Sequence, residues 1–208
     1  MLYFIELSAV ITGAIYGVLL ARQNQMDFIG VVTLALIVAF GGGTLRDLFL
    51  DRHPLFWIRE SHFTIIVFGL AILVFLLPPI PEKAKSLLTI PDAFALGLFS
   101  VAGTTAALEC QTPLFIAALF GVITGTFGGA IGDVVCNRIP GIFQPSTTLY
   151  ATCSFIGSWV YIALVTYEPT SEFAAPIAIT LTVVFRLLSV RYGWKLPVLA
   201  EQTTHAKK

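Results

Sequence analysis

The chain has 208 residues, of which 57% are hydrophobic and only 12% are charged. Soluble domains usually carry about twice that charged fraction, so the composition excludes an ordinary soluble protein and indicates an all-α polytopic membrane protein. Twelve basic residues balance twelve acidic ones, and this balance shows none of the basic surface that a nucleic-acid partner requires. At this length we expect a single transmembrane domain over residues 1–208.

Seven segments are mainly apolar over the roughly 20 residues that a membrane-spanning helix needs. A polar and aromatic connector over residues 51–62 leads into the third segment, and the charged loop that contains Lys83 and Lys85 separates the third from the fourth. The tail from Arg191 is polar. The predicted spans are Tyr3–Ala21, Phe28–Leu50, Phe63–Ile80, Ile90–Leu108, Pro113–Cys136, Ser146–Tyr167 and Phe173–Val190.

A repeated sequence organises these spans. Residues 37–54 read IVAFGGGTLRDLFLDRHP and residues 123–140 read ITGTFGGAIGDVVCNRIP, so the second copy follows the first at an offset of 86 residues. An internal repeat constrains the whole fold, and here it predicts two related three-helix units and a seventh helix without a counterpart. We expect repeat one over about residues 3–81, repeat two over about 89–167, the seventh helix over about 173–190 and the tail over 191–208.

The odd number of spans in each repeat has a geometric consequence. Each three-helix unit begins on one face of the membrane and ends on the other, so the second unit is inserted upside down and the fold is an inverted repeat. Lysine and arginine accumulate on the face that holds the C-terminus, and these residues favour the cytoplasmic side of a membrane. The N-terminus is therefore expected outside and the C-terminus in the cytoplasm.

Glycine clusters lie inside the second and fifth spans, at Gly41–Gly43 and at Gly128–Gly129. Glycine weakens a helix interior by about 1 kcal/mol relative to alanine, and a break would free backbone carbonyls, which can replace part of a cation's hydration shell. Lipid tolerates freed carbonyls only beside protein or water. Close helix packing is the alternative, but two clusters repeated beside an acid favour a break that lines a pathway.

Asp47 and Asp133 each follow their glycine cluster by about one turn, which places them about 6 Å further along the helix axis. A carboxylate at membrane depth usually faces a cavity or a cationic partner, and Arg46 and Arg138 are the candidate partners. The functional interpretation is a lining that attracts cations. The alternative is an ion pair that only joins helix ends.

A second pair of acids, Glu6 and Asp92, occurs at the same offset of 86 residues, each early in its span. Such acids could lie in a vestibule or be solvated at the membrane interface. Interfacial solvation is the favoured interpretation.

Two aspartates inside a membrane also raise the question of an aspartyl protease, and residues 130–133 read AIGD, one residue away from a G-x-G-D pattern. A catalytic dyad needs its carboxylates within a few ångströms of each other. Inverted repeats would instead place Asp47 and Asp133 toward opposite membrane faces. We therefore predict no enzymatic activity, and we expect no cofactor and no structural metal.

The block GGGTLRD followed by HPLFW, with its weaker copy GGAIGD, resembles the prokaryotic branch of the trimeric intracellular cation (TRIC) channels, which overlaps the bacterial glycine-transporter-like membrane proteins. The resemblance implies an inner-membrane homotrimer among membrane lipids, with one potassium-permeable pathway through each protomer, lined by the glycine-kinked second and fifth helices. It also implies that potassium or sodium is the permeant ion. Phe127 stands where the first copy has Gly41, which implies a smaller kink in the fifth helix. By motif position the pathway residues are Gly41, Gly42, Gly43, Asp47, Gly128, Gly129 and Asp133, with Arg46 and Arg138 as ion-pair or gating partners.

Two functions remain open at this point. The first is a passive monovalent-cation channel. The second is a secondary transporter of glycine or a similar small zwitterion, because inverted repeats with broken helices also build transporters and half-helix ends can hold a carboxylate and an ammonium group. A purely architectural repeat is a third reading. The short chain leaves little protein for alternating access, which favours the channel.

Overall fold

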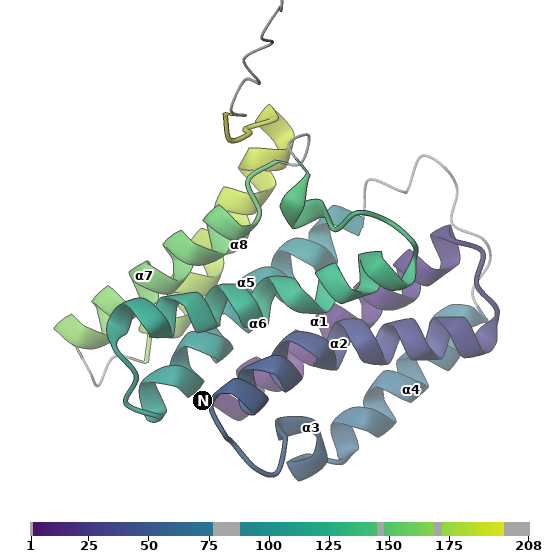
Figure 1. Ribbon diagram of the computed structural model, residues 1–208, viewed down its shortest axis with the longest axis horizontal. Coiled ribbons are helices and arrows are strands. Elements are labelled where there is room, and N and C mark those ends of the chain that lie inside the picture. The colour runs from purple at the N-terminus through teal and green to yellow at the C-terminus, as the bar shows by residue number, and fades with distance from the viewer. Residues whose placement is uncertain (1, 77–87, 145–147, 169–171, 198–208) are drawn as a thin grey trace, which may run out of the picture.

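The computed structural model describes residues 2–76, 88–144, 148–168 and 172–197, and these residues form helices without a strand among them (Figure 1). The all-helical prediction is confirmed. Two short helices, α3 and η2, lie in the connectors that follow the repeated block, where the sequence indicated only turns. The elements are α1 (Leu2–Gln23), α2 (Phe28–Phe49), α3 (Phe56–Arg59), α4 (His62–Phe75), α5 (Thr89–Glu109), α6 (Leu114–Val135), η2 (Gly141–Phe143), α7 (Ala151–Tyr167) and α8 (Ala174–Tyr192).

Five of these helices, α1, α2, α5, α6 and α8, are long and apolar enough to cross a membrane. The helices α4 and α7 are apolar but shorter, with 14 and 17 residues. Large apolar side chains on α4 are exposed, as expected for a surface that lipid covers. The chain is therefore a helical membrane protein. The exposed residues of α4 include Ile65, Phe68, Ile72 and Leu73.

The third and sixth predicted spans differ from the helices that the structure has. The predicted third span runs to Ile80, whereas α4 ends at Phe75, and residues 77–80 lie outside the described residues. The sixth span was predicted from Ser146, but α7 begins only at Ala151. Residues 146 and 147 lie outside the described part of the chain. Residues 148–150 are not helical, and the carbonyl groups of Thr148 and Leu149 accept hydrogen bonds from side chains of α8.

Four long helices end in the same local structure. After α1, α2, α5 and α6, one non-glycine residue takes a positive φ and the next amide bonds back into the last turn, which is the Schellman arrangement. After α2, Arg52 N donates to the Asp47 carbonyl at 2.8 Å. After α6, Arg138 N donates to the Asp133 carbonyl at 2.9 Å. The positive-φ residues are Gln25, Asp51, Gln111 and Asn137, two pairs separated by the repeat offset.

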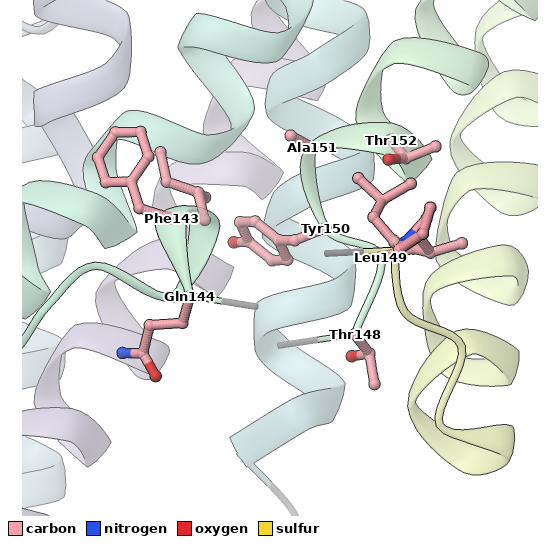
Figure 2. Close-up of a pocket in the computed structure, with 11 residues that line it drawn as sticks. Phe143, Gln144, Thr148, Leu149, Tyr150, Ala151 and Thr152 are labelled. Atoms are coloured by element: carbon pink, nitrogen blue, oxygen red, sulfur yellow. The ribbon is translucent and has the colours of Figure 1, made fainter. Parts of the chain in front are cut away.

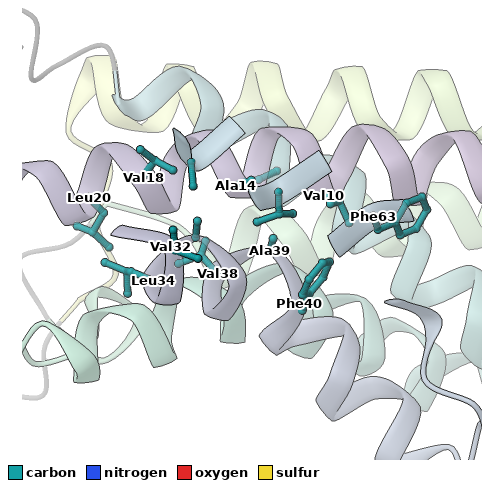
Figure 3. Close-up of a cluster of buried hydrophobic side chains, with 14 of the residues drawn as sticks. Val10, Ala14, Val18, Leu20, Val32, Leu34, Val38, Ala39, Phe40 and Phe63 are labelled. Atoms are coloured by element: carbon teal, nitrogen blue, oxygen red, sulfur yellow. The ribbon is translucent and has the colours of Figure 1, made fainter. Parts of the chain in front are cut away.

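At the centre of the molecule α2 and α6 lie side by side and run in opposite directions (Figure 1). Small side chains bring neighbouring helices close together: a methyl group added at Gly17 would lie 2.9 Å from the Cα of Ala35. Close packing of this kind drives helix association in lipid, where burial of apolar surface contributes little. The core between α1, α2 and α4 (Figure 3) includes Val10, Ala14, Val18, Leu20, Val32, Leu34, Val38, Ala39, Phe40 and Phe63.

The opposite directions of α2 and α6 separate the two aspartates of the repeated block. Asp47 lies in the last turn of α2 and Asp133 in the last turn of α6. Each aspartate therefore lies at its own end of the molecule, among a different group of charged side chains. These two groups are the candidate functional sites.

Candidate functional site

The glycine clusters lie within unbroken helices. The α-helix of α2 continues through Gly41–Gly43, and that of α6 continues through Gly128–Gly129. The predicted break with freed carbonyl groups is therefore wrong. The missing side chains instead allow close contact with a neighbouring helix, which is the alternative interpretation given above.

Individual glycines of the two clusters make different contacts. A methyl group at Gly42 would overlap the carbonyl oxygen of Thr124 in α6, and one at Gly43 would overlap the ring of Phe56. A methyl group at Gly41 would meet Ile131 Cδ1 at 3.2 Å. These positions pack against protein.

In α6 the two glycines differ from each other. A methyl group at Gly128 would overlap the Val38 carbonyl oxygen of α2. At Gly129 the nearest atoms would be the Tyr150 hydroxyl at 3.8 Å and a Tyr16 ring carbon at 4.0 Å. Gly128 is therefore a packing position, whereas Gly129 faces a cavity.

One group of charged side chains surrounds the C-terminal end of α2. Arg46 donates from Nη2 to Glu6 Oε1 at 3.1 Å and from Nε to Asp47 Oδ1 at 2.8 Å. The other oxygen of Asp47 accepts a hydrogen bond from the Phe56 amide at 2.8 Å, and Arg59 Nη2 lies 3.5 Å from Glu6 Oε2. Glu6, Arg46 and Asp47 are at most 2% exposed. We call Glu6, Arg46, Asp47 and Arg59 the closed cluster.

The closed cluster supports the ion-pair interpretation of Asp47. Both oxygens of its carboxylate are hydrogen-bonded and solvent does not reach them, as a buried charge requires. The expected partner, Arg46, is present. The expected interfacial solvation of Glu6 is wrong, because Arg46 holds this carboxylate in the interior. The Phe56 ring covers the Arg46 guanidinium at 5.2 Å.

The other group of charged side chains, at the C-terminal end of α6, borders open space. A cavity of about 170 Å³ lies there, and a neighbouring cavity of about 260 Å³ has several of the same lining residues. We call the two cavities together the polar cavity. Side chains from α1, α5, α6 and α8 contribute to both parts, namely Tyr16, Asp92, Asp133 and Arg186.

Asp92, near the beginning of α5, is held by two other elements. Its Oδ1 accepts a hydrogen bond from the Tyr150 hydroxyl at 2.8 Å, and its Oδ2 lies 3.5 Å from Arg186 Nη2. Arg186 also donates from Nη1 to the Thr148 hydroxyl at 2.8 Å and to the Leu149 carbonyl at 3.0 Å, so α8 positions the loop that carries Tyr150. Asp92 is only 8% exposed. Interfacial solvation is therefore wrong for Asp92, and its place in the polar cavity corresponds to the vestibule alternative.

Asp133 lines both parts of the polar cavity and is half-buried. Its Oδ2 accepts a hydrogen bond from the Gly141 amide at 2.9 Å, which repeats the bond between Asp47 and the Phe56 amide. Both aspartates thus hold the connector that follows their helix. The expected partner Arg138 is exposed and forms no salt bridge within the described residues, although it lines the larger part of the cavity.

The repeat offset shows why one end is closed and the other is open. Arg46, which binds Glu6, corresponds to Gly132 in the second repeat. Asp92, which corresponds to Glu6, therefore receives no arginine from α6 and pairs with Arg186 of α8. The contact with Arg186 is longer than that of the closed cluster.

A second ion pair at the end of α2 also has no counterpart at the end of α6. Arg52 Nη1 lies 3.1 Å from Glu109 Oε2 and joins the end of α2 to α5. At the offset of 86 residues, Arg52 corresponds to Arg138, but Glu109 corresponds to the neutral Gln23, which lines the polar cavity. The end with the polar cavity therefore has the neutral residues Gly132 and Gln23 where the other end has Arg46 and Glu109, and this leaves space there.

An outer groove of about 300 Å³ adjoins the polar cavity. Gly141, Ile142 and Tyr150 line both spaces. In Figure 2 the Tyr150 ring lies between the segment with Phe143 and the segment that leads to Leu149. Tyr150 therefore borders both spaces, and its hydroxyl binds Asp92.

Sequence reasoning missed Tyr16, Tyr150 and Arg186. One signal was available for Arg186, because a charge inside an apolar span usually has a partner or a functional role. Nothing comparable marks the tyrosines. Tyr16 lies inside the first predicted span, and Tyr150 lies near the start of the sixth, where an aromatic residue is also typical of interfacial anchoring. Their place in the polar cavity depends on how α1, α5 and α8 pack.

The arrangement can hold a small ion or polar molecule, since carboxylate and phenol oxygens face a space of suitable size. It does not form an aspartyl dyad, because Asp47 and Asp133 lie at opposite ends of the antiparallel helices α2 and α6. Groups of three or more potential metal ligands are absent from the described residues.

Known membrane proteins are similar to this chain over nearly its whole length. A family model described as a glycine transporter matches residues 3–79 and 89–166, nearly the same residues as the two predicted repeats. The UPF0126 inner membrane protein YadS of Escherichia coli K12 is 35% identical over 202 residues, which cover 96% of this chain and 97% of YadS. A UPF0126 membrane protein of Vibrio cholerae is 34% identical over 96% of this chain and 83% of its own length.

Solved structures agree with these sequence matches. The TRIC trimeric intracellular cation channel orthologue from Rhodobacter sphaeroides has a TM-score of 0.85 and 30% identity, over 92% of this chain and 98% of its own. A structure from work on conductance through TRIC cation channels has a TM-score of 0.84 and 27% identity, over 95% and 96% of the two chains. The chain belongs to the membrane-protein family that the glycine-transporter model describes, and it has the fold of the prokaryotic TRIC channels.

Proposed function

We propose that the protein is a potassium-permeable monovalent-cation channel and that the polar cavity is the entrance to a pathway within each protomer. The observation that carries the proposal is the presence of two carboxylates, Asp92 and Asp133, in one cavity beside Gly129 of α6. Acidic side chains at a pore entrance concentrate cations. The relatives of known structure and similar fold are named as cation channels.

The proposal includes seven spanning helices, arranged as two inverted three-helix repeats and a final helix. Its support is the reciprocal contact between α2 and α6. Gly42 faces the Thr124 carbonyl and Gly128 faces the Val38 carbonyl, and a shift of 86 residues converts one contact into the other. A two-fold axis produces reciprocal contacts, and an axis in the membrane plane relates inverted repeats.

The pathway proposed here runs from the polar cavity along α2 and α6 toward the closed cluster. The two helices touch at Gly42 and Gly128, and the ion pairs of Arg46 fill the space at the far end. This arrangement corresponds to a closed pathway. Potassium passes when α2 and α6 move apart at their glycine contacts and the closed cluster loosens, with Asp133 as the acid that meets the ion first.

The charge distribution and the relatives support proposals for the orientation in the membrane, the oligomeric state and the location of the protein. We propose that the polar cavity faces the cytoplasm and the N-terminus lies outside, because more lysine and arginine residues lie near the C-terminal side. The Rhodobacter sphaeroides channel is named as trimeric, and we extend that state to this chain as a homotrimer. The E. coli relative is named as an inner membrane protein, and lipid of that membrane would cover exposed apolar faces such as that of α4.

The test is reconstitution of the purified protein in liposomes, with potassium efflux and glycine uptake measured on the same preparation. We expect a potassium conductance that increases linearly with concentration over the low millimolar range and that falls in Asp133→Asn. Asp51→Asn is the matched control, because Asp51 is an exposed acid at the end of α2 outside the polar cavity.

The same experiment tests the transporter alternative. One observation favours it, because two carboxylates and two guanidinium groups line the polar cavity and could bind the two ends of a zwitterion. The names of the solved structures favour the channel. Saturable glycine uptake without potassium conductance would replace the channel proposal with the transporter.

A further inference from the structure

The polar cavity contains a buried arginine that a cation entrance alone does not require. Arg186 lines both parts of the cavity and is only 7% exposed. It belongs to α8, which has no counterpart in the repeat. A fixed positive charge at this position opposes the entry of a cation, so its presence calls for an explanation within the proposed function.

Arg186 is held less completely than the arginine at the other end of the molecule. Arg46 contacts two carboxylates at 2.8 and 3.1 Å, and its side chain is 2% exposed. Arg186 contacts one carboxylate, that of Asp92, at 3.5 Å, with a side chain that is 9% exposed. The Nε atom of Arg186 is buried and has no hydrogen-bond partner among the described residues, whereas Nε of Arg46 binds Asp47.

The remaining contacts of Arg186 do not involve Asp92. Its Nη1 donates to the Thr148 hydroxyl and to the carbonyls of Thr148 and Leu149. Its guanidinium carbon lies 4.6 Å from the centre of the Tyr150 ring, a distance that suits a cation–π contact. Nη2 can therefore leave Asp92 while the side chain stays anchored to the loop.

We infer that Arg186 is a tethered counter-cation that competes with the permeant potassium ion for Asp92 and thereby sets the cation selectivity of the polar cavity. This inference rests on the proposed channel function. When Nη2 binds Asp92, the two acids and the two arginines of the cavity balance, and an entering cation finds no net attraction. When a potassium ion takes the place of Nη2, the carboxylate of Asp92 coordinates the ion directly.

The experiment measures the potassium-to-chloride permeability ratio from reversal potentials in planar bilayers under a KCl gradient. Arg186→Gln gives the cavity a net negative charge and should raise the ratio by about threefold or more, because a unit charge roughly 6 Å from an ion changes its occupancy by about that factor even in bulk water. Asp92→Asn has the opposite charge effect and should lower the ratio by a similar factor.

The double variant Asp92→Asn/Arg186→Gln separates electrostatics from structural damage. It removes one negative and one positive charge, so the cavity is again neutral and its potassium-to-chloride permeability ratio should return to within about twofold of the native value. If the single variants instead acted through structural damage, the double variant would deviate from the native ratio at least as much as they do. Thr148→Val is the matched control, since it removes one hydrogen bond of Arg186 and leaves the contact with Asp92. Its ratio should equal that of the native protein.

The outcomes distinguish the inference from the function on which it rests. If the native protein conducts no potassium, the proposed function fails. If the native protein conducts and the folded Arg186→Gln variant keeps the native ratio, the inference fails and the channel remains. If the single variant Arg186→Gln does not fold, the double variant Asp92→Asn/Arg186→Gln decides. A potassium-to-chloride permeability ratio in the double variant as low as that of Asp92→Asn overturns the inference.

Discussion

Gly42 of α2 lies directly against the backbone carbonyl of Thr124 in α6, without a side chain between the two helices. The reciprocal contact joins Gly128 to the carbonyl of Val38. Two backbone contacts therefore define the crossing of α2 and α6. Such contacts allow dense packing and weak Cα–H···O hydrogen bonds in lipid, and they connect the two halves of the chain at the centre of the proposed pathway.

Replacement of Gly128 by alanine should destabilise the protein. The new methyl group would overlap the Val38 carbonyl, a backbone atom that cannot rotate away, and overpacking of this kind costs about 1–3 kcal/mol. We expect a lower midpoint of thermal unfolding in detergent. Gly129→Ala is the matched control, because its methyl group would meet atoms no closer than 3.8 Å; an equal loss of stability in both variants would contradict the contact.

The two repeated aspartates should respond differently to replacement by asparagine. Asp47→Asn removes one carboxylate from the buried ion pairs of Arg46, and the loss of one partner of a buried pair costs about 3 kcal/mol or more. Asp133→Asn keeps an oxygen that can accept the Gly141 hydrogen bond, so it should cost about 1 kcal/mol or less. Urea or thermal unfolding in detergent measures both values.

Asp133→Asn should also be tested for its effect on potassium flux. Asp133→Asn should reduce the flux at unchanged stability, because the carboxylate lines the polar cavity. A stable Asp133→Asn variant with native flux would show that this acid only holds the connector after α6. In that case its role would match the structural role of Asp47.

Removal of the Tyr150 ring should open the polar cavity to the outer groove. Ala130 lines the cavity on the far side of the ring, so Ala130→Cys reports its accessibility in a background with the three native cysteines replaced by alanine. We expect a positively charged methanethiosulfonate reagent to modify this cysteine faster after Tyr150→Ala than after Tyr150→Phe, because only the alanine variant loses the ring that borders both spaces. Equal rates in all three proteins would mean that the ring is no barrier.

A buried pair of hydroxyl groups should contribute to the stability of the second repeat. Ser100 Oγ of α5 and Ser154 Oγ of α7 lie 2.6 Å apart and are fully buried. Replacement of either serine by alanine should cost about 1 kcal/mol, because the hydrogen bond between the hydroxyls is lost while the remaining hydroxyl keeps a carbonyl, that of Leu96 or Gly121. The double variant should cost less than the sum of the single ones, and strict additivity of the unfolding free energies would argue against the hydrogen bond.

Much of the architecture could be predicted from the chain itself. Apolar spans and the repeat of residues 37–54 at 123–140 are properties of local sequence, and five helices of the required length and hydropathy lie where spans were expected. The start of α7 could not be predicted in this way. Residues 148–150 look as apolar as the rest of the span, but they are not helical, and Arg186 and Ser189 of α8 bind the carbonyl of Leu149 there.

The site was only partly predictable. Asp133 and Gly129 were expected along a pathway, and both line the polar cavity. Asp92 was expected at the membrane interface and is instead held by Tyr150 and Arg186. These partners come from elements far away in the sequence, so no pattern around Asp92 identifies them.

Sequence by itself determined the membrane class, the duplication and the presence of acids inside apolar segments, because composition and repeat register need no knowledge of packing. Tertiary structure alone decided whether a glycine breaks a helix or brings two helices together, since both uses follow from the same missing side chain. It also decided which acid is buried in an ion pair and which lines a cavity. That difference arises because Arg46 of α2 binds Glu6 in the first half. The corresponding residue of the second half is Gly132, which has no side chain, so Asp92 pairs with Arg186 of α8 instead.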